Sequence, residues 1–318
     1  MVLISTMAAM LLAEWAVRFH YGPYSALGTG VELSWMRNSP SDLRKLFTID
    51  PSFGFRPILG NAYYNQYGTK VNGYAITKKA SVERLLFIGD SVTNRAKIID
   101  ALKRSYAGST EFEYWNAGVE SFNTVQEVDY YQKYNRHIKP DHVILTFLLN
   151  DFETTPVAFY DSDRLVVYQL DVRPEEISRF WYEHSYLYRR FIAAKIAQGH
   201  IGDRIAIVRQ VEEKLTELRD SLRADNIAFT VVILPLFIPY EAWSADARAK
   251  REKILQVVKD LGVAYFDLLE PLNEAIKKGI IIQESKDDFT HPSQQVADVF
   301  AAFLHERRIF AKTELGHR

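Results

Sequence analysis

The sequence predicts an α/β protein whose five-stranded, mainly parallel sheet is covered by helices on both faces, a three-layer α/β/α sandwich. Three observations predict this class. From about residue 80 onward, short apolar runs alternate with longer helical stretches, as strands alternate with crossover helices in parallel sheets. The chain has 318 residues, which suffices for one large α/β domain with additions. Polar clusters also follow the predicted strands at their carboxyl ends, where such sheets bind ligands.

The predicted strands are five short runs, four of them dominated by Val, Ile, Leu or Phe, at 84–88, 112–116, 142–148, 228–234 and 263–267. Helical stretches separate or follow them at 125–135, 204–224, 245–261 and 294–307. The stretch 153–200 is predicted to be an insertion, and its helical part, 174–198, is crowded with aromatic residues. Such a stripe indicates packing rather than ligand binding. The part near 151–165 follows the carboxyl end of a predicted strand and could cover a ligand site there.

The N-terminal segment 1–20 is predicted to be a membrane anchor or signal-like helix. Its apolar run, 2–17, is short for a membrane span, and Glu14 interrupts it. Glu14 and Arg18 are spaced to pair one helical turn apart. The alternative is an amphipathic or buried N-terminal helix.

Residues 21–80 are predicted to form an irregular collar between this helix and the main domain, 81–312. The collar is rich in Gly, Pro, Tyr and Asn, with short strands expected at 53–57 and 69–76. Its aromatic content is too high for a disordered linker, because such side chains usually become buried. We therefore expect the collar to pack on the core.

Composition narrows the possible functions. The formal net charge of −1 and the pI near 6.7 provide no basic field for a phosphate backbone, so nucleic acid is not an expected partner. The chain contains no cysteine, which excludes disulfides, thiol catalysis and thiolate zinc sites. Neither a metal-ligand spacing nor a phosphate-binding Gly-rich loop is apparent, so we expect no metal and no cofactor.

Four polar clusters follow the predicted strands or precede the last helix. They are Gly89-Asp90-Ser91, Asn116-Ala117-Gly118, Asn150-Asp151 and Asp288-Phe289-Thr290-His291. A hydroxyl at the end of a buried strand, together with an imidazole that follows a carboxylate by three residues, supplies the groups of a serine nucleophile. The clusters therefore predict a serine hydrolase.

Together with their neighbours, these clusters resemble the four signature blocks of the SGNH hydrolases, also called GDSL-type esterases, in their usual order. The resemblance spans about 83–310, and 115–151 is also similar to membrane-anchored bacterial members. It implies a flavodoxin-like sandwich and activities that include esterases, lipases, thioesterases, carbohydrate deacetylases and some acyltransferases. Two positions depart from the family pattern: Leu148 stands where Gly is frequent, and Val92 follows the nucleophile in place of Leu.

The residue roles follow from acyl transfer. Ser91 is expected to attack an ester carbonyl, His291 to act as general base and then acid, and Asp288 to orient the imidazole. The backbone N–H groups of Ser91 and Gly118 and the side-chain amide of Asn150 are the expected oxyanion donors.

Each assignment has an alternative. Asn150 and Asp151 could have the structural role of capping a turn and no other. His291-Pro292-Ser293 could likewise serve only as the start of the last helix. Asp287 adjoins Asp288 and could replace it as the orienting carboxylate. Arg95 lies one helical turn after Ser91 and could receive an anionic substrate group, or it could form a surface ion pair with Asp100 or another neighbour.

Three functions are compatible with this sequence. The first is an esterase acting on a small-molecule or glycan ester, with carbohydrate O-acetyl groups as a candidate substrate. The second is an O-acyltransferase that uses the same triad to modify an envelope polysaccharide, and the third is a non-catalytic envelope protein. For the location we expect the cell membrane, through one N-terminal anchor, with the catalytic domain on the extracytoplasmic, periplasmic side; a cytoplasmic location stays open.

Overall fold

The computed structural model describes residues 2–25, 31–32, 45–107, 111–161, 164–170, 172, 176–199 and 204–310. Its contacts divide the chain into two compact units. Residues 1–56 and 153–209 form one, here called the N-terminal unit, and residues 57–152 and 210–318 form the other, here called the sheet unit. The predicted segments 1–20, 21–80 and 81–312 are a different partition of the chain and stay predictions.

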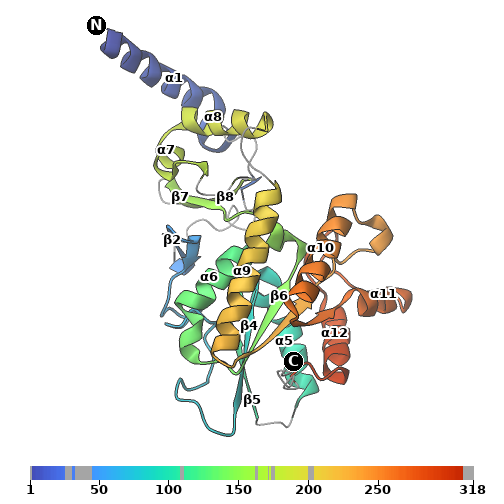
Figure 1. Cartoon of the computed structure of the whole chain (residues 1–318). Coiled ribbons are helices and arrows are strands. Elements are labelled where there is room, and N and C mark those ends of the chain that lie inside the picture. Colours follow the sequence, from blue (N-terminus) through green and yellow to red (C-terminus); the bar gives the residue numbers. More distant parts are fainter. Residues whose placement is uncertain are drawn as a thin grey trace. The chain divides into compact units, whose positions relative to one another are not determined.

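The sheet unit contains a five-stranded parallel sheet of order β10-β9-β6-β4-β5 (Figure 1). The strands are β4 (Glu83–Ile88), β5 (Phe112–Asn116), β6 (His142–Phe147), β9 (Ala228–Ile233) and β10 (Ala264–Asp267). Numbered along the chain they follow the order 2-1-3-4-5, which is that of flavodoxin-like sheets. The prediction of five strands in a parallel sheet is confirmed, with ends that differ by one residue at most.

Helices cover both faces of this sheet. On one face, α5 (Lys97–Ser105) and α12 (Gln294–Glu306) bury apolar side chains against Leu85, Phe87 and Ile144. On the other, α6 (Thr124–Lys133) and α9 (Arg204–Ala224) lie together through a Lys214–Asp129 ion pair of 2.5 Å. The remaining helices are α4 (Ser91–Asn94), α10 (Ala245–Leu261) and α11 (Leu269–Lys277), with 3-10 turns η1 (Asn135–Ile138), η2 (Leu149–Phe152) and η4 (Tyr240–Ala242). The three-layer sandwich is therefore observed.

The central strand β6 explains why this sheet is parallel and covered on both faces. All six of its residues are buried, so it has no solvent-facing side. His142 at its start is accommodated because its Nε2 lies 2.8 Å from the Thr230 hydroxyl. Burial lowers the pKa of His142 to about 4, so the ring is neutral at pH 7.

Residues 58–80 form turns and irregular structure in place of the strand expected at 69–76. The structure has only one isolated bridge there, between Tyr64 and Lys70. Asparagine side chains explain the difference, because Asn65 and Asn72 accept backbone N–H groups two residues further on, at 2.9 and 3.0 Å. These local bonds compete with strand pairing.

In the N-terminal unit, β7 (Val157–Asp161) and β8 (Arg164–Gln169) form an antiparallel hairpin, and β1 (Val31–Glu32) pairs with β8. We did not predict this hairpin within the insertion. The expected strand at 53–57 is present as β3 (Gly54–Pro57), which pairs with β2 (Phe47–Asp50). The aromatic stretch forms two helices, α7 (Arg179–His184) and α8 (Tyr186–Ala197).

Glu14 ties the N-terminal helix α1 (Val2–Ser25) to the start of α8. Its carboxylate accepts the N–H groups of Tyr186 and Leu187, at 2.8 and 2.9 Å, and the Ser185 hydroxyl at 2.8 Å. The expected pair with Arg18 is also present, at 2.7 Å. The charged residue that interrupts the apolar run is therefore a helix cap.

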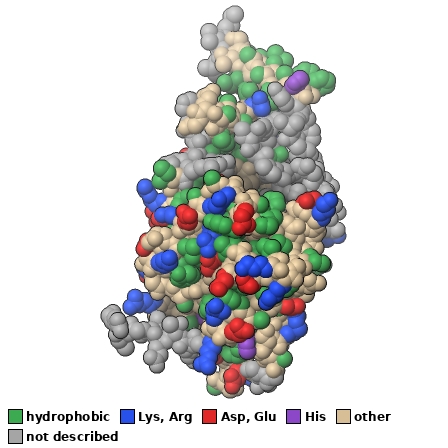
Figure 2. Space-filling view, turned by 90° about the vertical axis from the view of Figure 1, so that its right-hand side faces the viewer, with side chains coloured by type: hydrophobic (Ala, Val, Ile, Leu, Met, Phe, Trp, Pro, Cys, Tyr) green, Lys and Arg blue, Asp and Glu red, His purple; other side chains and the backbone are tan. Residues whose placement is uncertain are grey.

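Among the helices that the structure describes, none is both long enough and apolar enough to span a bilayer. The expected transmembrane helix at 1–20 is thus not supported. On the face shown in Figure 2, Lys and Arg are interspersed with Asp and Glu, and no large patch of one sign is visible there.

Candidate active site

The chain presents Ser91 on a tight turn directly after β4. Gly89 makes this turn possible, because a Cβ at that position would collide with the hydroxyls of Thr93 and Thr146, which are hydrogen-bonded to each other. Asp90 then caps α4 by accepting the Val92 N–H at 2.9 Å. Ser91 is the first residue of α4. Its N–H is therefore one of the N–H groups of the first turn that have no acceptor within the helix.

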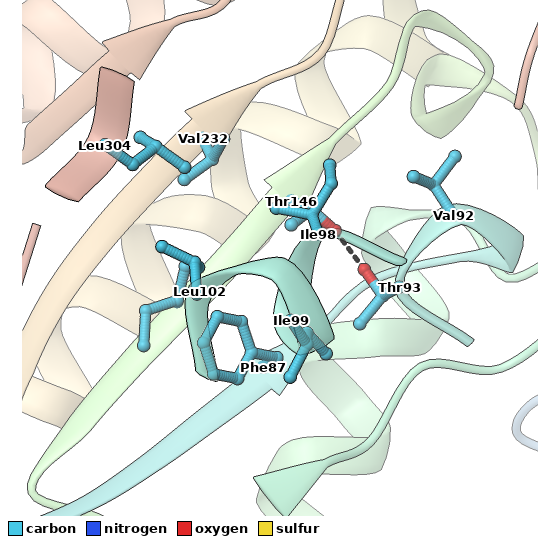
Figure 3. Close-up of a pocket in the computed structure, with 10 residues that line it drawn as sticks. Phe87, Val92, Thr93, Ile98, Ile99, Leu102, Thr146, Val232 and Leu304 are labelled. Carbon is cyan, nitrogen blue, oxygen red and sulfur yellow. Dashed lines mark hydrogen bonds between the residues drawn. The ribbon is translucent and has the colours of Figure 1, made fainter. Parts of the chain in front are cut away.

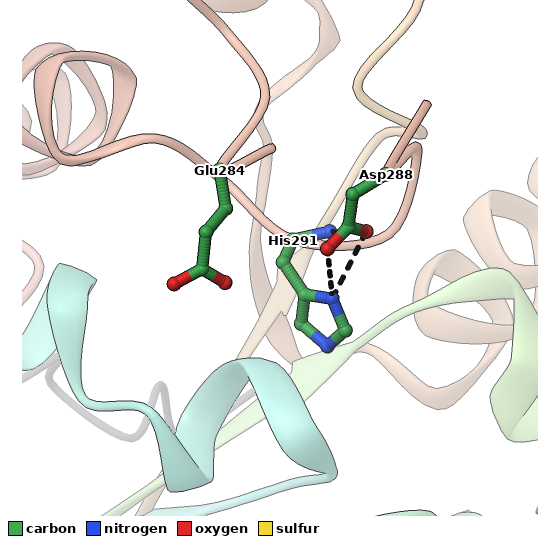
Figure 4. A group of neighbouring side chains, drawn as sticks. All are labelled: Glu284, Asp288 and His291. Atoms are coloured by element: carbon green, nitrogen blue, oxygen red, sulfur yellow. Dashed lines mark hydrogen bonds and ion pairs between the residues drawn. The ribbon is translucent and has the colours of Figure 1, made fainter. Parts of the chain in front are cut away.

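His291 lies against the nucleophile although 200 residues separate them. The Ser91 Oγ and the His291 Nε2 are 2.8 Å apart. On the other side of the ring, Nδ1 lies 2.9 Å from Asp288 Oδ2 and 3.0 Å from Oδ1 (Figure 4). An ionised carboxylate can only accept hydrogen bonds, so the proton on the ring is at Nδ1, which donates a hydrogen bond to Asp288. Nε2 then accepts a hydrogen bond from the Ser91 hydroxyl.

Asp288 is held as a charged acceptor. It also receives the Thr290 hydroxyl at 2.9 Å and the N–H groups of Thr290 and His291 at 3.1 Å. Burial by itself would raise the pKa of Asp288, but the hydrogen bonds from His291 and Thr290 outweigh it and lower the pKa. Asp287 occupies a left-handed turn position, and Asp288 is the residue that contacts the ring.

The loop that carries Asp288 and His291 is closed by backbone bonds. The Glu284 N–H donates to the His291 carbonyl at 3.1 Å, and the Ser293 N–H donates to the Ile282 carbonyl at 2.9 Å. Ser293 also caps α12 by accepting the Val296 N–H at 3.1 Å. The segment therefore both begins the last helix and places His291 next to Ser91, and the catalytic roles of these two residues stay predictions.

Arg95 points to the same site, and its partners are carboxylates of the surrounding loops. It pairs with Glu284, lies 3.9 Å from Glu120 and approaches Asp288 Oδ2 to 4.0 Å. The alternative partner Asp100 instead pairs with Lys103, at 3.1 Å. In this structure Arg95 is thus a bridge between loops, and its role in substrate binding stays a prediction.

Glu284 receives a second cation from Lys97, whose Nζ lies 2.7 Å from its Oε1 and 2.9 Å from the Pro292 carbonyl. Burial would raise the pKa of Glu284, but Lys97 and Arg95 lower it. Glu284, Asp288 and His291 place one ligand atom each within 4.8 Å of one another, a spacing that suits a metal ion (Figure 4). All three side chains already have partners, so the cluster is better described as a charge network.

Two expected oxyanion donors are engaged with other acceptors in this structure. The Gly118 N–H donates to the Asn116 side chain at 2.8 Å, and one Asn150 amide N–H donates to Asp90 Oδ2 at 3.1 Å. Gly118 is required for another reason: a Cβ there would collide with the Asn94 N and lie 2.6 Å from the Thr93 carbonyl carbon. The oxyanion roles of Ser91, Gly118 and Asn150 stay predictions.

A small cavity lies beneath the nucleophile helix (Figure 3). Its volume is about 10 Å³, and its lining is mainly apolar, with Val92 and Thr93 from the nucleophile turn and Thr146 from β6. That volume suffices for one water molecule at most. The core at this position therefore offers no room for a long acyl chain.

The sequence interpretation missed three acidic residues around the site. Glu284 and Glu120 contact Arg95, and burial raises the pKa of Glu120 to about 7 against the opposing effect of Arg95. Glu127 on α6 is buried, and neither carboxyl oxygen has a hydrogen-bond partner among the described residues. Burial, and then the charge of Asp90, raise its pKa well above the usual value for a glutamate. Their side chains lie 29 to 193 residues from Ser91 in the chain, so no local spacing marks them.

No family model matches this chain, and no curated protein does. Among solved structures, it is similar to an acetylxylan esterase from Geobacillus stearothermophilus, with 16% identity over 72% of this chain and 96% of that one and a TM-score of 0.47. An alpha/beta hydrolase enzyme from the metagenome of Lake Arreo, Spain, has 15% identity over 71% and 95% of the two chains and a TM-score of 0.47. Another acetyl xylan esterase has 14% identity over 71% and 99%, with a TM-score of 0.45.

Proposed function

We propose that this protein is a serine esterase of the SGNH type that hydrolyses short-chain carboxylic esters, with O-acetyl groups on carbohydrate as the substrate class. One observation carries the proposal: Ser91 Oγ, the His291 ring and the Asp288 carboxylate form a continuous chain of bonds, with 2.8 Å and 2.9 Å links. That chain has the polarity needed to draw a proton away from the serine hydroxyl.

In the first half-reaction, Ser91 Oγ attacks the ester carbonyl carbon while its proton moves to His291 Nε2. The ring is then a cation, which the Asp288 carboxylate stabilises through Nδ1. The carbonyl oxygen becomes negative, and we assign the Ser91 N–H at the start of α4 as a donor to it. Collapse breaks the bond to the alcohol oxygen, which takes the proton from Nε2 and departs. Ser91 is left acylated.

In the second half-reaction, water attacks the acyl carbon and gives a proton to His291 Nε2. Collapse breaks the bond to Ser91 Oγ, which recovers the proton, and the carboxylic acid is released. His291 thus acts as base and then as acid in each half-reaction. No cofactor is required by this sequence of steps.

The packing beneath α4 is compatible with a short acyl group, although Ser91 is not among the residues that line the cavity there. The cavity of about 10 Å³ beneath α4 has no room for a fatty acyl chain. Val92 and Ile99 close it with buried side chains. Acetyl esters place only one methyl group beyond the carbonyl carbon, so this packing does not exclude them.

The test is hydrolysis of aryl esters of graded chain length by the full chain and by Ser91→Ala and His291→Ala. Each variant is expected to lose activity by roughly 10⁴-fold or more, because either change removes the nucleophile or its base. Aryl acetate is expected to be the best substrate of the series. A Ser105→Ala variant, with its hydroxyl bonded to the Ala101 carbonyl on α5, is the control. Undiminished hydrolysis by Ser91→Ala would refute the proposal.

Two other functions use the same geometry. An acyltransferase would pass the acyl group from Ser91 to a sugar hydroxyl in place of water, so product analysis with and without a polysaccharide acceptor separates the two reactions. A non-catalytic protein would keep the side chains without reacting. Labelling of Ser91 by a fluorophosphonate probe distinguishes that case, since an inert serine would support it.

For the location, we propose attachment to a membrane surface through α1, with the sheet unit on the extracytoplasmic side. Exposed apolar side chains on α1, including Met7, Leu11, Trp15 and Phe19, support the attachment. Co-flotation of the full chain with phospholipid vesicles, and its loss in Leu11→Asp, tests the attachment. Protease protection in intact cells tests the side.

A further inference from the structure

A second cavity, of about 320 Å³, lies in the sheet unit between the segment 60–76 and β5. Its size is within the range of small-molecule sites. No charged residue is among the described residues that line it. Its polar lining consists of carboxamides and its apolar lining largely of aromatic rings: Asn65, Gln66, Asn72, Tyr67, Tyr74 and Trp115.

The walls of this cavity are held in place by bonds within the chain. Asn65 accepts the N–H groups of Tyr67 and Thr69, at 2.9 and 3.2 Å, and its amide donates to the Thr69 hydroxyl at 2.7 Å. Asn72 accepts the Tyr74 N–H at 3.0 Å. A site with a fixed backbone loses little entropy when a ligand binds.

The aromatic side of the cavity is equally fixed. Trp115 on β5 is buried, its Nε1 donates to Glu113 at 3.0 Å, and the Arg84 guanidinium lies 5.3 Å from its ring centroid. The Tyr74 ring packs on it with a centroid distance of 5.8 Å and is itself partly exposed. Tyr74 therefore offers a supported ring face to whatever enters the cavity.

These groups define the chemistry of the ligand. Carboxamides both donate and accept hydrogen bonds, which suits hydroxyl groups, and ring faces contact apolar C–H groups. An anion or a cation would find no opposite charge among the residues that line the cavity. A neutral sugar ring carries both hydroxyls and apolar faces. We propose that this cavity is a binding subsite for a neutral carbohydrate chain.

The segment that lines the cavity is hydrogen-bonded to the turn that carries Ser91 and to the end of β5, through residues that do not themselves line the cavity. The Tyr64 hydroxyl accepts the amide of Asn94, three residues after Ser91, at 2.8 Å, and the Lys70 N–H donates to the Asn116 carbonyl at 2.7 Å. The subsite would therefore hold part of the same glycan whose ester is attacked. This inference deepens the proposed esterase function and rests on it for the identity of the reaction, while binding itself needs no turnover.

The experiment measures binding to the Ser91→Ala full chain, which cannot consume a ligand. Unmodified xylohexaose, cellohexaose, mannohexaose and chitohexaose are titrated by calorimetry or NMR. At least one is expected to bind with a Kd of about 1 mM or below. Tyr74→Ala and Gln66→Ala, made in the same background, are each expected to weaken that binding about tenfold.

Tyr63→Ala is the matched control, because Tyr63 lies in the same segment, is 58% exposed and does not line the cavity. It should leave the affinity unchanged. Circular dichroism of each variant verifies the fold, and the exposed Gln66 provides a variant that removes no buried group. If none of the four oligosaccharides binds at about 10 mM, or if Tyr63→Ala weakens binding as much as both cavity variants, the subsite is refuted.

The proposed function is tested separately, on aryl acetate with an active Ser91. Failure of that reaction together with oligosaccharide binding would overturn the esterase and keep the subsite. With both intact, Tyr74→Ala should lower the ratio of kcat/KM on acetylated oligosaccharide to kcat/KM on aryl acetate by about tenfold. An unchanged ratio would show that the cavity does not serve the reaction.

Discussion

The Arg95 guanidinium and the Glu284 carboxylate form an ion pair that connects the turn after the nucleophile helix to the loop that carries His291. Lys97 reinforces the connection by contacting both Glu284 and the Pro292 carbonyl. Two segments nearly 190 residues apart are thereby held together, and Ser91 and His291 lie on these segments. In the proposed mechanism, a few tenths of an ångström between Ser91 Oγ and His291 Nε2 would change the rate of proton transfer.

This connection predicts coupled mutational effects. Arg95→Ala and Glu284→Ala should each lower kcat/KM on aryl acetate about tenfold. The kcat/KM of the double variant should be no lower than that of the less active single variant. The exposed pair Lys103–Asp100 on α5 is the matched control, and Asp100→Ala should leave kcat/KM within about twofold. Additive losses in the double-mutant cycle would mean that the two side chains act independently.

Asp288→Asn should lower kcat by roughly 1,000- to 10,000-fold with little effect on KM, because an amide no longer fixes the imidazole tautomer or stabilises its cation. Asp287→Asn is the control: it removes the same charge one residue away and should retain most of the activity. Steady-state kinetics on aryl acetate measures both. Equal losses would assign the orienting role to the loop as a whole.

Gly118→Ala should destabilise the protein by about 1–3 kcal/mol and reduce activity, because its Cβ would collide with the backbone of Thr93 and Asn94 behind the nucleophile. Gly73→Ala is the control, since a Cβ there meets nothing within 4 Å. Urea unfolding reports the stability of each variant. A Gly118→Ala protein as stable as Gly73→Ala would contradict the close packing described for this turn.

Glu120 predicts a pH dependence of stability. Its pKa is raised to about 7 in the folded protein, first by burial, so between about pH 4.5 and 7 the folded state binds more protons than the unfolded state. Stability from this group is present below about pH 4.5 and is lost as the pH rises to 7. A glutamine at this position does not titrate, so Glu120→Gln does not lose this stability. The free energy of unfolding of Glu120→Gln minus that of the wild type should therefore rise by about 2–3 kcal/mol between pH 4.5 and 7. A constant difference from pH 4.5 to 7.5 would contradict the prediction.

Glu14→Ala should loosen the start of α8, because it removes the acceptor of the Tyr186 and Leu187 N–H groups. The loss of such a cap costs about 1 kcal/mol, which corresponds to roughly fivefold faster amide exchange at these two positions. Glu183→Ala removes a neighbouring carboxylate that does not cap α8 and should leave their exchange unchanged. Equal rates in all three proteins would mean that Glu14 does not hold this helix.

Local sequence patterns were enough to predict the five-stranded parallel sheet. Strands such as 142–147 are continuous apolar runs because both faces of a parallel sheet are buried, so the run itself reveals the strand. The hairpin of β7 (Val157–Asp161) and β8 (Arg164–Gln169) was not predicted, because the sequence interpretation describes this part of the insertion only as a segment that could cover the site. The segment 69–76 was predicted as a strand, but the side chains of Asn65 and Asn72 bind their own backbone there.

The sequence alone determined which residues can do chemistry, because a nucleophile, a base and a carboxylate are recognisable by residue type and by their place at strand ends. Only the tertiary structure decided how these groups are held. Arg95 has its ionic partner 189 residues away, the pKa of Glu284 is lowered and that of Glu120 is raised to about 7, although all three look alike as charged residues in a sequence. The physical reason is that burial and nearby charges set a side chain's ionisation and partners, and both depend on segments that approach one another only when the chain has folded.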